Sequence, residues 1–185
     1  MEDILSSLAT YGYLILFVYS LGGGFVALLA AGMLSAVGKM DFVTTVTVAF
    51  AANFLGDMLL FYMARYNKKE VMRHLRPQRR KLALAHLLMR RYGSRIIFFQ
   101  KFIYGVKTLI PLAIGLTRYE AKRFSLYNLG SALVWAIVVG FAGYAAGEAV
   151  ARLLEEGSHY SFLMPVFLLA LLGGIWWYLQ RATAK

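Results

Sequence analysis

Residues 96–117 read IIFFQKFIYGVKTLIPLAIGLT, an apolar stretch long enough to cross a bilayer but interrupted in its interior. Lys101 and Lys107 bracket Gly105, and Pro111 follows them. Glycine and proline weaken the interior of a helix, and a lysine deep in the membrane is costly. The pattern therefore predicts a re-entrant hairpin: two half-helices that return to the side they came from, their irregular backbone covered by protein or water.

A second apolar stretch, residues 11–37, is interrupted by the run Gly22, Gly23 and Gly24. These glycines predict a second re-entrant hairpin, and a full span kinked at the glycines is the alternative. Other apolar stretches lack such a break and meet the requirement of roughly 20 residues for a spanning helix. They are residues 42–66, 125–147 and 162–179, which we expect to cross the membrane.

The composition of the chain also indicates a membrane protein. Of its 185 residues 60% are hydrophobic, compared with about 45–50% apolar residues in soluble domains. Lysine and arginine total 20 against 9 acidic residues, and eleven of these basic residues lie between Arg65 and Arg95. The positive-inside rule places that cluster in the cytoplasm and accounts for the excess of basic residues. Since no nucleic-acid recognition motif accompanies the charge, nucleic acid is not an expected partner. The absence of cysteine excludes disulfides and thiolate chemistry.

The basic residues also orient the segments. If residues 96–117 return to the cytoplasm, the basic residues at 118–123 join the cytoplasmic cluster. A hairpin and span that start outside are then followed by a hairpin and span that start inside. A short sequence similarity agrees with this repeat: LAAGM at 29–33 resembles LAIGL at 112–116. Inverted repeats with broken helices are typical of secondary transporters, whose site lies near the membrane midplane. We therefore expect an all-α integral membrane protein with an inverted repeat in a single domain.

Residues 67–95, between the two repeats, are too charged to span a membrane. Leu84, Leu87 and Leu88 recur at helical spacing within a basic sequence. The pattern predicts an amphipathic helix lying on the cytoplasmic membrane surface, where lysines and arginines meet anionic head groups. The alternative is a solvated basic linker.

The sequence lacks the motifs of common enzyme classes. It has no P-loop lysine motif, no HExxH and no GxSxG. His74, His86 and His159 lie far apart and do not suggest a metal site. We therefore expect a protein that is not an enzyme and that uses neither a metal nor a cofactor.

The polar residues at membrane depth form a small set. Asp57 is the only acid well inside a predicted span, and Lys101 and Lys107 are the cations of the interrupted segment. An ion pair that merely joins the repeats would explain Asp57 and one lysine. One acid cannot neutralise two lysines, however, and a spare cation beside unwound backbone predicts a binding site for an anion.

Other residues are expected to complete this site. The glycines at 22–24 and Gly105 would let backbone amides approach a phosphate group. The supporting polar residues are Asn53, Gln100, Thr108 and Asn128.

The sequences NFLGDMLLFYMAR at 53–65, FFQKFIYGVKTLIPLAIGLTRYEAKRFSLYNLGSALVWA at 98–136 and GYAAGE at 143–148 resemble the DedA family of membrane proteins. That family shares its core with the VTT-domain lipid scramblases of eukaryotes. The resemblance implies an inner-membrane location, two facing re-entrant loops and transport of phosphorylated lipids such as undecaprenyl phosphate or phospholipids. It also implies dependence on the proton gradient, as in several members of the family.

The chain departs from the family pattern at several positions. Lys101 and Lys107 stand where the family usually has arginines, and the glycines at 22–24 with Phe25 replace a proline-rich turn and a glutamate. Any proton coupling would then rest on Asp57. The expected function is a lipid flippase or scramblase whose two lysines hold the phosphate. The alternatives are a proton-coupled transporter of a small soluble ion or solute and a structural or regulatory envelope protein; membrane lipids are the expected partners, and a homo-oligomer is left open.

Overall fold

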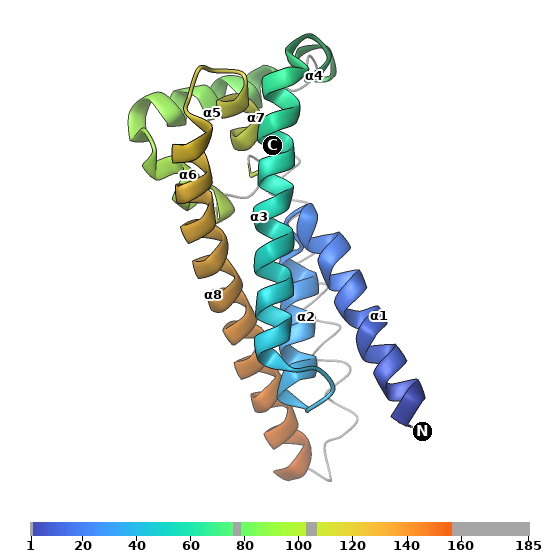
Figure 1. Ribbon diagram of the computed structural model, residues 1–185. Helices are drawn as coiled ribbons and strands as arrows, with labels where there is room; N and C mark the ends of the chain where they lie inside the picture. Colours follow the sequence, from blue (N-terminus) through green and yellow to red (C-terminus); the bar gives the residue numbers. More distant parts are fainter. Residues whose placement is uncertain (1, 76–78, 103–106, 157–185) are drawn as a thin grey trace.

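The computed structural model describes residues 2–75, 79–102 and 107–156 (Figure 1). All regular elements of these residues are helical, as expected. They are α1 (Glu2–Leu21), α2 (Phe25–Ala36), α3 (Phe42–Tyr66), α4 (Lys68–His74), α5 (Arg79–Tyr92), α6 (Arg95–Phe99), a 3₁₀ turn (Gln100–Phe102), α7 (Leu109–Gly115) and α8 (Ala121–Glu156). The predicted span 162–179 and Gly105 lie outside the described residues.

Two long apolar helices, α3 and α8, lie against each other and form the axis of the molecule (Figure 1). Both are long and apolar enough to cross a membrane. Helix α3 has the predicted bounds, and the carboxylate of Asp41 caps its start by accepting a hydrogen bond from the Thr44 amide at 2.6 Å. Helix α8 is longer than the predicted 125–147, because charged residues continue the helix beyond its apolar part. Near its end, Arg152 donates to Glu148 one turn away, at 2.6 Å.

Helices α1 and α2 are joined by the glycine turn, which lies beside the middle of α3 (Figure 1). Helix α1 begins at Glu2 rather than near residue 11, since the polar residues before the apolar stretch continue the same helix. Helix α1 packs against α3, and α2 packs mainly against α8. A Cβ on Gly56 of α3 would collide with the carbonyl oxygen of Leu21, so the end of α1 lies directly on the α3 backbone.

Helix α2 packs on α8, and helix α7 packs on α3. Gly32 of α2 approaches α8 so closely that a Cβ would lie 2.5 Å from the carbonyl oxygen of Gly140. Gly115 of α7 approaches α3 in the same way, against the carbonyl oxygen of Phe61. Gly32 and Gly115 occupy the same place in LAAGM and LAIGL, so the sequence similarity corresponds to equivalent close helix contacts.

The close contact of Gly32 is testable by adding one methyl group. We expect Gly32→Ala to destabilise the protein by about 1–3 kcal/mol, because the backbones of α2 and α8 would have to separate. Gly130→Ala is the matched control in α8, since its Cβ would meet no atom closer than 4.0 Å. Thermal unfolding in detergent measures both variants, and equal stability of the two would contradict this packing.

The basic segment contains helices α4 and α5, so the linker alternative is wrong for these residues. Leu82 and Ala85 of α5 are buried in the cluster that also holds α7. Leu84 and Leu87 are 44% and 60% exposed, because α7 covers the opposite face of α5. Whether α5 lies on a membrane surface stays a prediction.

Candidate functional site

A layer of polar side chains separates two hydrophobic clusters along the long helices. On α3, Asn53 and Asp57 lie between Ala49 of one cluster and Phe61 of the other. On α8, Asn128 and Ser131 lie between Phe124, which is in the same cluster as Phe61, and Trp135, which is in the same cluster as Ala49. Most buried polar residues of the described chain are therefore concentrated at one level of the fold, beside the turn between α1 and α2.

Lys101 is committed to an ion pair inside this layer. Its ammonium donates hydrogen bonds to the carboxylate of Asp57 and to the side-chain oxygen of Asn53, which lie one turn apart on α3. All three residues are buried, with at most 6% of their surface exposed. The contact joins the 3₁₀ turn Gln100–Phe102 to α3, and each buried charge is compensated by the other.

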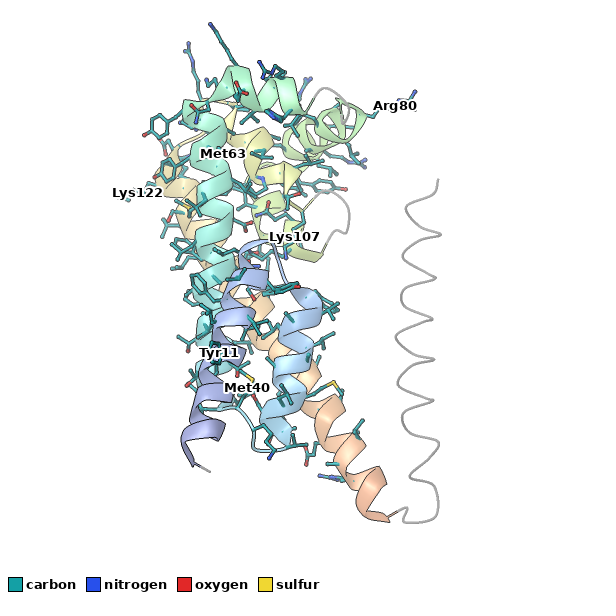
Figure 2. All side chains as sticks on the ribbon, turned by 90° about the vertical axis from the view of Figure 1, so that its right-hand side faces the viewer. Tyr11, Met40, Met63, Arg80, Lys107 and Lys122 are labelled. Carbon is teal, nitrogen blue, oxygen red and sulfur yellow. The ribbon has the colours of Figure 1, made fainter. Side chains whose placement is uncertain are left out.

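Lys107 has a different environment. Its ammonium donates a hydrogen bond to the carbonyl oxygen of Gly23 at 2.9 Å and lies 4.5 Å from the ring centre of Trp135. Among the described residues it makes no ion pair. Figure 2 shows it beside the turn between α1 and α2. Lys107 is thus a cation held by a neutral oxygen and an aromatic face, without a direct ion-pair partner in the described part of the chain.

The glycine turn contributes a carbonyl rather than amides to this site. The amide of Gly23 donates a hydrogen bond to the backbone carbonyl oxygen of Ser20 at 3.0 Å, and the amide of Gly24 donates one to that of Tyr19 at 2.9 Å. This differs from the expectation that the amides face a ligand. Gly23 has a φ of +100°, and a Cβ on it would lie 2.5 Å from the Lys107 ammonium nitrogen, so glycine is required there. A Cβ at Gly22 would meet no atom closer than 3.7 Å.

Several buried polar atoms have no hydrogen-bond partner among the described residues. Both polar atoms of the Gln100 side chain are unpartnered, as are the side-chain oxygens of Ser20 and of Asn128. The amide nitrogen of Asn128 donates to the carbonyl oxygen of Phe54 at 3.2 Å. An unmade hydrogen bond on a buried group costs about 1–3 kcal/mol, so these atoms favour a site that takes in water or a polar ligand. Thr108 is exposed and lies outside this buried set.

Arg65, near the end of α3, contacts the end of α7 and the chain that follows it. Its guanidinium donates to the carbonyl oxygens of Gly115 at 3.1 Å and Tyr119 at 2.5 Å, and it lies 4.8 Å from the ring centre of Phe61. The Gly115 carbonyl belongs to the last residue of α7 and the Tyr119 carbonyl to the connection that follows, and the C-terminus of a helix leaves such acceptors unpaired. Arg65 therefore positions α7, the helix that starts two residues after Lys107.

Trp135 and Ser20 are site residues that the sequence analysis missed. Trp135 is 1% exposed and lies within α8 rather than near its ends. Tryptophan in spanning helices is enriched at the membrane interfaces, so a tryptophan in the middle of an apolar stretch was an available signal. Ser20 had no comparable signal, because serine is common in apolar helices.

Comparison with known proteins identifies the family. The VTT domain model matches residues 22–145. The chain is 26% identical to inner membrane protein YohD of Escherichia coli strain K12, over 99% of this chain and 96% of that protein. It is 33% identical to YghB and 30% identical to YqjA of the same strain, each over 77% of this chain and 67% of the relative. No solved structure matches. The resemblance seen in the sequence is confirmed: this chain belongs to the VTT-domain family, the DedA proteins, and is an inner membrane protein.

Proposed function

We propose that this protein moves phosphorylated lipids across the inner membrane, with Lys107 as the cation that holds the head group. The observation that carries the proposal is the contrast between the two lysines. Lys101 is neutralised by Asp57, whereas the partners of Lys107 among the described residues are a carbonyl oxygen and an aromatic ring. A phosphate oxygen is a much stronger acceptor for an ammonium group than a carbonyl oxygen is.

The proposed membrane arrangement makes α3 and α8 spans and the two hairpins re-entrant. Helix α2 has 12 residues, which rise about 18 Å, less than the roughly 30 Å of a hydrocarbon core. Helix α7 is shorter still, with 7 residues. The turn after α1 lies beside the middle of α3, so the polar layer would sit near the midplane. This depth suits a head group that passes between leaflets while its tail stays in lipid.

Proton coupling, if the transport uses it, rests in this proposal on Asp57. It is the one acid among the buried residues of the described chain. Its partner Lys101 lies on the second repeat, so a movement of that repeat would separate the pair. A carboxylate deprived of its cation inside the membrane favours the protonated form. Separation and re-pairing would then take up and release one proton in each cycle.

A reconstituted flip assay tests the proposal. Fluorescent phosphatidylglycerol, phosphatidylethanolamine and undecaprenyl phosphate are loaded into vesicles that contain the full chain, with and without a pH gradient. We expect flipping of at least one phosphorylated lipid above empty vesicles, with the recovered lipid unchanged in mass, since transport breaks no bond. Uptake of a soluble anion without lipid flipping would favour the soluble-solute alternative. Absence of both activities would favour a structural or regulatory role.

The position of α5 can be tested separately with a single cysteine, because the chain has none of its own. A bimane label on Leu87→Cys is expected to be shielded from iodide in anionic nanodiscs, because Leu84 and Leu87 face away from α7 between exposed arginines. Arg73→Cys on α4, whose side chain is 72% exposed, is the control that iodide should quench freely. Equal quenching at both positions would place α5 in water.

A further inference from the structure

Lys107 connects parts of the molecule that are remote in sequence. Its hydrogen bond to Gly23 joins the chain before α7 to the turn of the α1–α2 hairpin, across 84 positions. Its contact with Trp135 adds α8 to the same point. Among the described residues, no other hydrogen bond joins the turn of the first hairpin to the second repeat. The state of the Lys107 ammonium therefore bears directly on whether the two hairpins stay together.

The acceptor in this contact is the weaker kind. The Gly23 carbonyl is neutral, and an ammonium bound to a phosphate oxygen makes a shorter and stronger hydrogen bond. The ammonium has three N–H donors, so an arriving phosphate would displace Gly23 by drawing the nitrogen toward itself as the stronger acceptor. The Trp135 ring does not compete, because it attracts the cation through its face and leaves the N–H groups available.

We propose that Lys107 is a latch between the hairpins, that is, a reversible contact that holds them together. In the resting protein the Gly23 carbonyl accepts the hydrogen bond that a phosphate would otherwise accept, and binding of a head group releases the turn. Trp135 is the positioning residue that keeps the ammonium at the site during this exchange. This inference rests on the proposed function, since it assigns the regulation of the same site. It makes the resting protein closed at the turn, so that opening depends on an anionic head group. Gly23 fits this role because no side chain can stand between its backbone and the ammonium.

Distance measurements between two spin labels test the latch. In the cysteine-free chain, Tyr19→Cys lies in α1 just before the turn and Thr108→Cys lies next to Lys107; both side chains are exposed. We expect decyl phosphate to lengthen the distance between the labels, whereas decanol leaves it unchanged. Inorganic phosphate is the third arm: an equal response to it would assign the latch to the phosphate group alone, without the lipid tail.

The site variants give distinct results. With Lys107→Gln the distance should be long without any probe and should not respond to decyl phosphate. Gly23→Ala should also be long without probe, because its Cβ displaces the ammonium, but it should still bind decyl phosphate. Trp135→Leu should need about 2- to 30-fold more decyl phosphate for the same lengthening, with Trp135→Phe in between.

Calorimetric titration of decyl phosphate separates the latch from the proposed function. If decyl phosphate binds to the wild type but the label distance stays constant, the latch is overturned and the head-group site stands. If decyl phosphate does not bind at all, the proposed site fails. In that case the distance in Lys107→Gln decides on the latch: a longer distance supports the hairpin contact, and an unchanged distance overturns it.

Discussion

Lys107→Gln is expected to reduce lipid flipping about 10- to 100-fold while the protein remains folded. The estimate follows from the loss of a hydrogen bond to a charged group, worth about 1.5–3 kcal/mol, in which each 1.4 kcal/mol corresponds to about a factor of ten. Stability should change little, because the described partners of the ammonium are a neutral oxygen and an aromatic ring rather than a buried carboxylate. Initial flipping rates in vesicles and thermal unfolding in detergent measure the two effects.

Two variants serve as controls for this result. Lys107→Arg should retain more activity than Lys107→Gln, because the head group requires a cation. Lys39→Gln removes a lysine from the exposed connection between α2 and α3 and should flip lipid at the wild-type rate. Wild-type flipping by Lys107→Gln would remove the central element of the proposed mechanism.

Lys101→Gln is expected to lower the free energy of unfolding by about 3–5 kcal/mol, because it leaves the buried carboxylate of Asp57 without its cation. The double variant Lys101→Gln/Asp57→Asn should recover most of this loss, since two neutral amides can hydrogen-bond in the same place. Unfolding in detergent measures all of the variants. Additive losses in the double variant would show that the two side chains are not energetically coupled.

The double variant also separates the two proposed roles of the polar layer. It keeps Lys107 and should still flip lipid, but it lacks the ionisable pair and should lose any dependence on a pH gradient. Asp57→Glu should retain part of that dependence. If Asp57→Asn responds to the gradient as the wild type does, Asp57 is a structural partner of Lys101 and the proton proposal fails.

Much of the fold followed from local properties of the chain. The length of the apolar run predicted α3 with its observed bounds, and the glycines at 22–24 predicted the break between α1 and α2. The spacing of leucines predicted a helix over the basic residues now seen in α5. Each of these features depends on residues close together in sequence. The ends of α1 and α8 were less predictable, because helices continue through polar residues that hydropathy alone excludes.

The chemistry of the site was different. Sequence placed Lys101, Lys107 and Asp57 at membrane depth and indicated that one lysine would be spare, but both lysines were equivalent in that view. Folding makes them unequal: Lys101 meets Asp57 and Asn53 on α3, whereas Lys107 meets a glycine carbonyl and Trp135. These partners lie 28 to 84 positions away in the chain. Hydropathy and helical spacing along the sequence determine the length and type of each helix. The partner of a buried charge depends on which helices pack together, because only the assembled fold brings those groups within hydrogen-bond distance.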